Sequence, residues 1–232
     1  MPEMRTDCLR GVPGVLPPRM TTMDYTVRSI NQREVVEWLL KKHYAKRRTS
    51  ISHAFGLFNA AGIMEGVCTF GVPASQFLCS GVCGDEYRYL VLEFNRLCLS
   101  EPHDRNIASF LIGRAMSLLP RPRILVSYAD TGMGHIGYVY QSTNWIYTGL
   151  TRAMRRDRVP ESKAAKHSRH VFDPDAPLVE RPRKHRYIMF LGSKKERKAM
   201  SEALRWPILP YPKGESQRYD ASHKPVTQMV MF

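Results

Sequence analysis

The sequence lacks any long hydrophobic run: no stretch of its 232 residues approaches the roughly 18–20 apolar residues that a membrane-spanning helix requires. It is also poor in acidic residues, with 21 Asp and Glu against 35 Lys and Arg and a net charge of +14. Hydrophobic residues make up 43%, which is enough for an ordinary core and excludes a wholly disordered chain. The composition therefore indicates one or two globular domains, no membrane span and a polyanionic partner, with nucleic acid favoured over an anionic lipid surface.

Cysteine is scarce as well, and its pattern does not suggest a disulfide framework. The five cysteines are odd in number, and most lie in apolar surroundings, as Cys68 does. Cys79 and Cys83 are four residues apart with no second pair after them, so a structural zinc site is not favoured. Prolines interrupt any apolar signal segment near the N-terminus. We therefore expect the protein to work in a reducing cytoplasm.

Three regions of the chain differ in composition. Residues 1–22 contain four prolines and no apolar periodicity, so they are predicted to be a disordered extension, or sequence upstream of a start at Met23. Residues 23–150 carry the patterns of a folded core. Residues 151–232 are the basic part, because residues 151–206 alone hold 16 Lys and Arg against 7 Asp and Glu. We expect this C-terminal part to pack on the core and to contact DNA phosphates.

Alternating and capped segments predict the order β-α-β-β-β-α-β-α-β between Tyr25 and Gly149. The predicted strands are residues 24–30, 51–58, 63–70, 87–99, 124–129 and 145–148. One predicted helix follows Asn31, a second follows Asp104, and a third spans residues 134–144. Residues 59–62 suit the turn of an antiparallel hairpin, whereas the helix after residue 99 implies a parallel crossover. Beyond the core we expect a strand at 186–191 and a helix that Ser193 and Glu196 cap. The order is typical of a mixed α/β layer fold with one sheet.

Polar side chains gather where the strand at 124–129 ends. Ser127, Asp130 and His135 lie at or just beyond its carboxyl end, where α/β sheets collect ligands. Asp130 can act as a base for an amine, orient His135, or only cap the turn at Gly132. The aromatic side chains of Tyr128, Tyr138, Tyr140 and Tyr147 are nearby; they can stack on a nucleic-acid base or belong to the core.

Two basic clusters are candidates for contacts with DNA. The first ends the N-terminal helix and consists of His43, Tyr44, Lys46, Arg47 and Arg48; its alternative is a solvated helix end favoured by the dipole. The second consists of Lys166, His167, Ser168, Arg169 and His170, which we interpret as a phosphate-binding cluster. Metal ligation by His167 and His170 and an inert surface loop are the alternatives. The basic helix at 194–198 is expected to be a solvated face.

The order of elements resembles the GNAT superfamily of N-acetyltransferases. Residues 95–99 with 106–112 resemble the strand and helix start at which that superfamily holds the pyrophosphate of acetyl-CoA, although this turn has no glycine before Gly113. The resemblance implies that Arg96, Asn106 and Ser109 bind the donor; an ordinary capped core helix is the alternative. Residues 127–145 resemble a second superfamily segment, a strand and polar turn followed by a short helix. The expected fold is thus a GNAT-like mixed sheet flanked by helices, with a basic C-terminal extension.

More specifically, the chain resembles the Mom family of bacteriophage DNA adenine-modification proteins. The resemblance extends from Tyr25 to Tyr219 and is carried by the segments 29–34, 42–47, 55–59, 66–71, 95–97, 127–149, 166–170 and 209–215. It implies a GNAT-like enzyme that converts adenine in duplex DNA to an N6-carbamoylmethyl derivative and shields phage DNA from restriction in the cytoplasm of the infected host. The implied donor is acetyl-CoA or a glycine-derived compound. The resemblance also implies an iron requirement, for which no ligands are assigned.

These observations lead to one hypothesis and two rivals. The hypothesis is a DNA-adenine-modifying transferase that flips its target base. Its predicted catalytic residues are Asp130, Tyr44, Ser127, Tyr147 and His43, and its predicted substrate-binding residues are Tyr128, His135, Tyr138 and Asn144. The rivals are a conventional N-acetyltransferase acting on a protein or small amine, and a non-catalytic protein that coats DNA phosphates. The oligomeric state stays open.

Overall fold

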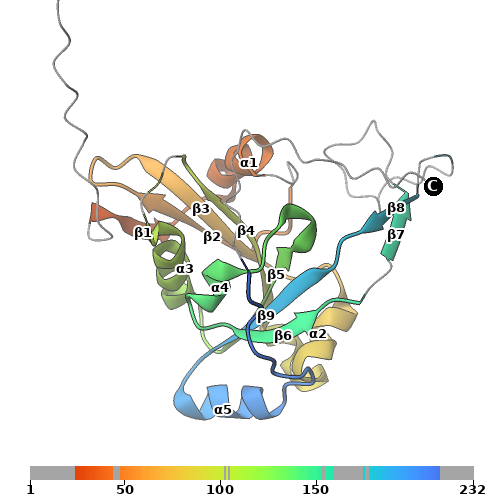
Figure 1. The fold of residues 1–232 in the computed structure, drawn as a ribbon. Helices are drawn as coiled ribbons and strands as arrows, with labels where there is room; N and C mark the ends of the chain where they lie inside the picture. Colours follow the sequence, from red (N-terminus) through yellow and green to blue (C-terminus); the bar gives the residue numbers. More distant parts are fainter. Residues whose placement is uncertain are drawn as a thin grey trace, which may run out of the picture.

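The computed structural model describes residues 24–43, 48–101, 103, 105–152, 155–158, 175 and 178–214. Seven strands form one sheet in the order β1-β2-β3-β4-β5-β9-β6 (Figure 1). They are β1 (Thr26–Ser29), β2 (His53–Phe58), β3 (Met64–Gly71), β4 (Val91–Leu99), β5 (Arg123–Asp130), β6 (Ile146–Leu150) and β9 (Lys184–Leu191). Only β4 and β5 pair in parallel; the other neighbours in this sheet are antiparallel. The predicted mixed sheet, its hairpin and its parallel crossover are confirmed.

Helices cover both faces of this sheet. They are α1 (Gln32–Lys41), α2 (Gln76–Cys83), α3 (Ile107–Leu118), α4 (Tyr138–Gln141) and α5 (Lys194–Glu202), with 3-10 turns η2 (Asp85–Leu90) and η3 (Thr131–Met133). Capping boxes open α1 at Asn31 and α5 at Ser193, as the sequence predicts. A second, two-stranded sheet pairs β7 (Arg155–Arg158) with β8 (Leu178–Arg181).

Several predicted elements differ in the structure. The predicted strand 87–99 begins only at Val91, because the preceding residues form η2 after Gly84, whose φ is +104°. The predicted helix 134–144 shrinks to α4, since Gly134 and Gly137 both adopt positive φ and interrupt it. Helix α3 begins after Asn106, not after Asp104, and Asp104 lies outside the described residues. Helix α2 and the β7–β8 pair were not predicted.

Strand β9 joins the two parts of the chain that differ in composition. It follows residue 150, lies between β5 and β6, and hydrogen-bonds along the whole of β5 from Arg123 to Asp130. The expected strand at 186–191 is thus confirmed. The sheet therefore contains residues from both sides of residue 150.

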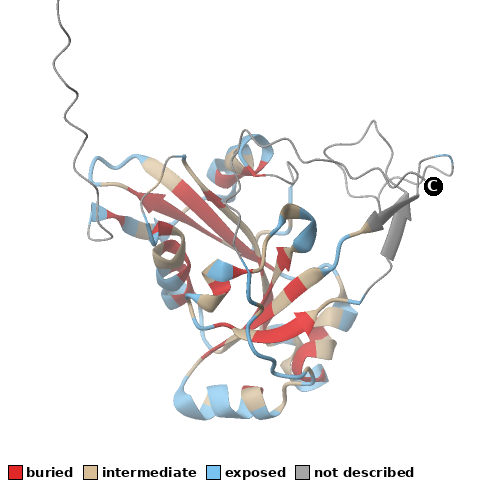
Figure 2. Ribbon diagram, in the orientation of Figure 1, coloured by how far each residue is buried: buried red, intermediate tan, exposed pale blue. Residues whose placement is uncertain are grey.

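The core is divided between the two faces of the sheet. One cluster joins α3 and α4 to the strands through Leu111, Ile112, Tyr140, Phe94 and Tyr187; the other joins α2 and α5 through Val82, Cys83, Met200, Val126 and Ile188. Figure 2 shows buried residues concentrated along the strands, while most of α5 is exposed. Side chains alternate between the two faces along a strand, so a strand residue in the first cluster points to the face of α3 and α4, and one in the second cluster points to the face of α2 and α5.

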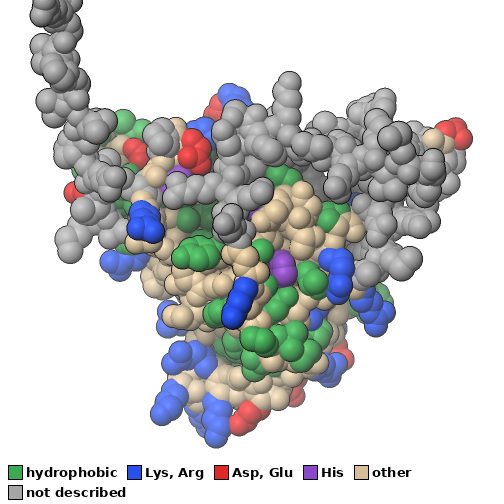
Figure 3. Space-filling model, in the orientation of Figure 1, with side chains coloured by type: hydrophobic (Ala, Val, Ile, Leu, Met, Phe, Trp, Pro, Cys, Tyr) green, Lys and Arg blue, Asp and Glu red, His purple; other side chains and the backbone are tan. Residues whose placement is uncertain are grey.

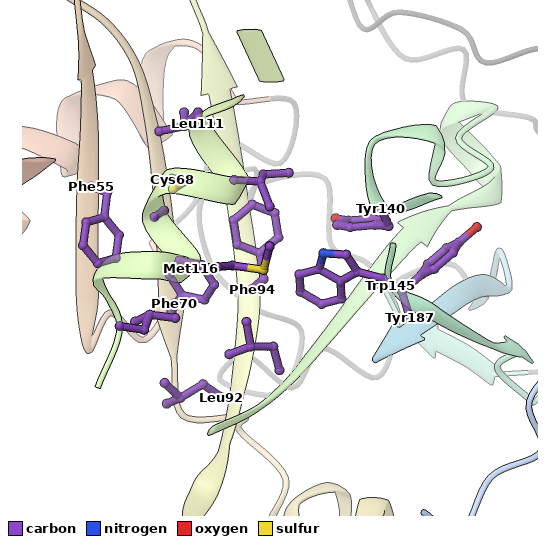
Figure 4. Packing of buried hydrophobic residues seen from close by; sticks show 14 of the residues in the cluster. Phe55, Cys68, Phe70, Leu92, Phe94, Leu111, Met116, Tyr140, Trp145 and Tyr187 are labelled. Carbon is purple, nitrogen blue, oxygen red and sulfur yellow. The ribbon is translucent and has the colours of Figure 1, made fainter. Parts of the chain in front are cut away.

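Aromatic rings connect the two halves of the first cluster. The Phe94 ring on β4 lies 6.1 Å from Trp145, which lies 5.3 Å from Tyr140, and Tyr140 lies 5.1 Å from Tyr187 on β9. Figure 4 shows these rings filling the space between β4 and the strands beyond it. This row of aromatic rings packs β4 against the strands beyond it, beginning at Phe94, the first residue of β4 that no longer pairs with β5.

Candidate active site

The site begins where the two parallel strands separate. Strands β4 and β5 pair only from Val91 to Glu93, although both continue well beyond that point. In the pairing with β3, Phe70 is opposite Phe94 and Thr69 is opposite Arg96, so Asn95 is an extra residue on β4. Such a bulge bends its strand. The Asn95 amide fixes the bulge, because Nδ2 donates to Ser50 O at 2.8 Å and Oδ1 lies 2.5 Å from the Thr69 hydroxyl.

A cavity of about 830 Å³ occupies the gap between the separated strands. Its walls are the second half of β4, the end of β5, the start of α3, and α4 with its preceding turn. Seven predicted site residues line it together: His43, Arg96, Asn106, Ser109, Tyr128, His135 and Tyr138. The volume is within the range of small-molecule and cofactor sites, roughly 300–1,000 Å³. Residues spread along the sequence thus meet at one opening in the sheet.

The α3 end of the cavity is suited to anions. Asn106 precedes α3 with φ 68° and makes no side-chain cap, so the first-turn N–H groups are not capped by its amide. Arg105 and Lys42 line the same cavity; Lys42 Nζ donates to the Ser100 hydroxyl at 3.1 Å and lies 4.0 Å from the centre of the Trp38 ring. Positive side chains beside a helix N-terminus are a recurrent anion site.

His43 and His135 occupy different walls of the cavity. His43 follows α1 and is buried, with its backbone N–H donating to Trp38 O. His135 follows η3, and its N–H donates to Asp130 O at 3.1 Å. Burial lowers the pKa of His135, an effect that the Asp130 charge partly opposes. At neutral pH His135 is therefore an uncharged imidazole.

The cavity is also lined by the carboxyl group of Glu93, which the sequence did not reveal as a site residue. Glu93 lines the cavity at the last paired position of β4. Burial raises the pKa of its carboxyl, and the charges of Arg96 and Lys184 only partly oppose that effect. Tyr128 lines the cavity from β5, and burial together with the Glu93 charge raises the pKa of its phenol. Perturbed groups of this kind cluster at functional sites.

Asp130 does not line the cavity but fixes one side of it. Its Oδ1 accepts from the Gly132 N–H at 3.0 Å, which is the turn-capping alternative for this residue, and its Oδ2 lies 3.0 Å from Lys184 Nζ. Lys184 is a lining residue. The catalytic role predicted for Asp130 stays a prediction, and the structure gives it a positioning role on Lys184 and the η3 turn.

Three further predicted residues lie behind or away from the cavity wall. The Ser127 hydroxyl is fully buried and hydrogen-bonds to Phe94 O at 2.7 Å and the Tyr140 hydroxyl at 2.8 Å. Tyr147 is buried with its hydroxyl 2.8 Å from His185 Nδ1. Asn144 is exposed in a turn with φ 60°. The functional roles predicted for these three residues are not tested by their placement.

Most of the predicted DNA-contacting residues lie outside the described part of the chain. These are Tyr44, Lys46, Arg47, Lys166, His167, Ser168, Arg169 and His170. Arg48 is described and exposed. Figure 3 shows Lys and Arg side chains gathered over α5, where Lys194, Lys195 and Lys198 are exposed. A solvated face and a specific contact both require exposed side chains, so the solvated face of this helix stays a prediction.

The sequence pattern explains why Glu93 was missed. A single acidic residue inside a run of Val, Leu and Phe reads as the solvent side of a strand. Its position beside the gap depends on the bulge at Asn95 and on the early end of β4–β5 pairing. The sequence places Lys184 in a basic cluster with Arg181, Arg183, His185 and Arg186, but it does not pair Lys184 with Asp130, because only the insertion of β9 beside β5 brings the two together.

Two further absences apply to the described residues only. No helix among them is long and apolar enough to cross a membrane. In the same part of the chain, no group of three or more His, Cys, Asp and Glu side chains is placed to hold a metal ion. The described residues therefore do not fit the iron that the sequence resemblance implies, and His167 and His170 lie beyond them.

The strand order and the cavity between the diverging parallel strands define a mixed α/β protein whose sheet opens between β4 and β5. The model of the Mom protein family matches residues 24–213, so the chain belongs to this family. It is similar to the methylcarbamoylase Mom of Escherichia phage Mu, with 25% identity over 210 residues that cover 82% of this chain and 86% of that protein.

Solved structures that align with this chain include an acetyltransferase and a protein assigned as one. A spermidine N-acetyltransferase from Vibrio cholerae in complex with CoA and spermine aligns with a TM-score of 0.43 and 9% identity, over 76% of this chain and 99% of that one. A Salmonella typhimurium protein assigned as an acetyltransferase, with acetyl-CoA, aligns with a TM-score of 0.42 and 10% identity, over 73% and 95%.

Proposed function

We propose that this protein is a transferase that converts adenine in duplex DNA to N6-carbamoylmethyl adenine, in the cytoplasm of a phage-infected bacterium, and so protects phage DNA from restriction. The observation that carries the proposal is the cavity between β4 and β5, which is lined by the cationic side chains of Arg105 and Lys42, the half-buried carboxyl of Glu93 and aromatic side chains. Membership of the Mom family and the similarity to a phage methylcarbamoylase support it.

The α3 end of the cavity fits the phosphates of an acyl-CoA donor. The uncapped first turn of α3 offers N–H donors, and Arg105 and Lys42 offer positive charge within the same cavity. Asn106 and Ser109 also line this end, with the Ser109 hydroxyl donating to Asn106 O at 2.9 Å. When bound, such a donor supplies an activated two-carbon group. Acetyl-CoA contains no nitrogen that could become the carbamoyl group, whereas a glycine-derived donor supplies both carbons and the nitrogen of the product and would use the same end.

The acceptor is a weak nucleophile, and the cavity addresses this difficulty. The lone pair of adenine N6 is delocalised into the ring, so the enzyme must hold the base close to the donor carbon. In the transfer N6 forms a bond to that carbon, loses one proton, and the leaving group departs with its bonding electron pair. The neutral imidazole of His135 on the cavity wall is able to accept that proton.

The rest of the chain provides the attraction to DNA. Basic residues outnumber acidic ones by 16 to 7 over residues 151–206, which suits contacts with phosphates. Because the cavity is set into the sheet, adenine must leave the base stack to reach it. Tyr138 lies on the cavity wall with 64% of its surface exposed, which suits stacking against an extruded base.

Nucleoside analysis of plasmid DNA tests this function. DNA from cells expressing the protein is digested and compared with DNA from cells carrying the empty vector. We expect a deoxyadenosine species heavier by about 57 Da, the carbamoylmethyl group replacing a hydrogen on a flipped base. A gain of about 42 Da would instead show acetyl transfer to the base. Unmodified DNA together with acetylation of a protein or small amine would contradict the proposal.

A further inference from the structure

We propose that Tyr187 is a positioning residue for the cavity: its hydroxyl holds the Ile136 carbonyl and thereby fixes the neighbouring imidazole of His135 at the cavity wall. Tyr187 lies on β9 and is not itself a lining residue, so it acts on the site through this turn. The inference rests on the proposed function in one respect, because that function makes His135 the group that accepts the N6 proton. The placement of His135 is measurable without any reaction.

The turn between η3 and α4 is anchored on both sides of His135. Its residues belong to no helix or strand, yet His135 lines the cavity. On one side the His135 N–H donates to Asp130 O, at the end of β5, over 3.1 Å. On the other side the carbonyl of the next residue, Ile136, accepts from the Tyr187 hydroxyl on β9. The position of His135 is therefore set by two neighbouring strands of the sheet.

Gln141 on α4 directs the Tyr187 hydroxyl toward its acceptor. Gln141 Nε2 donates to this hydroxyl at 3.1 Å, which leaves the proton of the hydroxyl for Ile136 O. The same Nε2 lies 3.3 Å from Ile136 O and 3.5 Å from Pro212 O. Because Tyr187 is fully buried, bulk water does not readily replace these bonds. A hydroxyl that accepts one bond and donates another is fixed in orientation.

The Tyr187 ring also packs directly on the backbone of this turn. A Cβ atom at Gly137 would lie 2.3 Å from Tyr187 Cε2, far closer than two carbon atoms pack. Gly137 has a φ of 84°, which favours glycine as well. The turn therefore lies against the ring with no side chain between them, and one residue supports it through both its ring and its hydroxyl.

The C-terminal segment covers the same network from outside. Residues 209–214 belong to a segment that carries the family resemblance, and the proposed function gives them no role. The Tyr211 hydroxyl donates to Trp145 O at 2.8 Å, just beyond α4. Gly214 lines the cavity, and a Cβ atom there would lie 3.8 Å from the Ile136 side chain. These contacts place the segment against the turn that Tyr187 supports.

The test follows His135 by nuclear magnetic resonance, which needs neither DNA nor donor. The variants are Tyr187→Phe and Gln141→Ala, and the matched control is Tyr25→Phe. Tyr25 is also buried, and its hydroxyl donates to Glu65 on β3 at 2.9 Å. The control thus removes a hydrogen-bonded tyrosine hydroxyl far from the turn. Both phenylalanine variants should lower the melting temperature by about 2–6 °C, the effect of one lost hydrogen bond.

The charged groups on this side of the cavity are the same in all three variants. Asp130 raises the pKa of His135 and partly opposes the effect of burial. Lys184, which lines the cavity, lies with its Nζ 3.0 Å from Asp130 Oδ2. A change in the titration of His135 therefore reports the access of water to its imidazole.

Release of the turn should admit water to this imidazole. Because burial lowers the pKa of His135, its titration midpoint should rise toward the ordinary value in Tyr187→Phe, and less far in Gln141→Ala. The midpoint should be unchanged in Tyr25→Phe, and that of His53 on β2 should be the same in every variant. Modified adenine in plasmid DNA should fall about 10–100-fold in Tyr187→Phe and stay at the wild-type level in the control.

Each result decides the proposal. An unchanged His135 midpoint in Tyr187→Phe would overturn it, as would an equal rise in Tyr25→Phe, which would show a general effect of lost stability. A raised midpoint with modification at the wild-type level would overturn it too, since the placement of His135 would then not matter to the reaction. If the midpoint rises as expected while wild type leaves plasmid DNA unmodified, the proposed function fails and the positioning of His135 by Tyr187 stands.

Discussion

Replacing Ser127 with alanine separates a catalytic from a structural role for this residue. The Ser127 hydroxyl hydrogen-bonds to Phe94 O on β4 and to the Tyr140 hydroxyl on α4. Because β4 and β5 stop pairing after Glu93, the Phe94 carbonyl has no ladder partner on β5, and the serine takes that place. Ser127 is 1% exposed, so neither substrate nor bulk water reaches it readily. The structure therefore predicts a loss of stability and not a direct loss of chemistry.

The expected loss follows from the cost of leaving a buried carbonyl without its donor. That cost is about 1–3 kcal/mol. In a domain of this size each kcal/mol lowers the melting temperature by about 2–4 °C. Urea denaturation of wild type, Ser127→Ala and Ser117→Ala measures it; the Ser117 control is exposed on α3 and donates only to Arg114 O of its own helix. Modified adenine should persist in Ser127→Ala well below its melting temperature. A change under about 0.5 kcal/mol together with loss of modification would refute this reasoning.

The remaining predictions concern the core, a helix cap and pH. Trp145→Ala should cost about 3–5 kcal/mol in urea denaturation, whereas Trp145→Phe should cost less because the buried indole N–H has no acceptor among the described residues. Ser193→Ala should cost about 1 kcal/mol by removing the α5 cap. Burial lowers the pKa of His135 and His185, so the unfolded chain takes up protons first as pH falls through 6.5, and the free energy of unfolding should decrease there. Denaturation at pH 7.5 and 5.5 checks this, with a smaller decrease expected for His185→Gln.

Local signals in the sequence determined what could be predicted about the fold. The capping boxes at Asn31 and Ser193 involve residues only three positions apart, so they are readable without the fold. The hairpin of β2 and β3 has its turn residues between two apolar runs. In contrast, β9 lies between β5 and β6, and its pairing with β5 joins strands more than fifty residues apart in the sequence. No local pattern encodes such a pairing.

The candidate site was only partly predictable for the same reason. His135 and Tyr138 were found because they lie beside a recognisable strand end and turn, and Arg96 because residues 95–99 resemble a GNAT strand. Glu93 was missed because its importance arises from a one-residue bulge and from the end of a strand pairing, both of which are tertiary features. The helix predicted at 134–144 is present but shorter, since the left-handed backbone at Gly134 and Gly137 delays its start to Tyr138.

The central claim is that adenine is modified in the cavity between β4 and β5, and blocking that cavity tests it most directly. Ala108 lines the cavity on α3, while Ser117 lies on the exposed side of the same helix. Both are replaced by tryptophan, the folding of each variant is verified by its thermal transition, and nucleosides from plasmid DNA are analysed by mass spectrometry. Ala108→Trp should abolish the modified deoxyadenosine that wild type and Ser117→Trp produce. A folded Ala108→Trp variant that modifies DNA as fully as wild type would contradict the account.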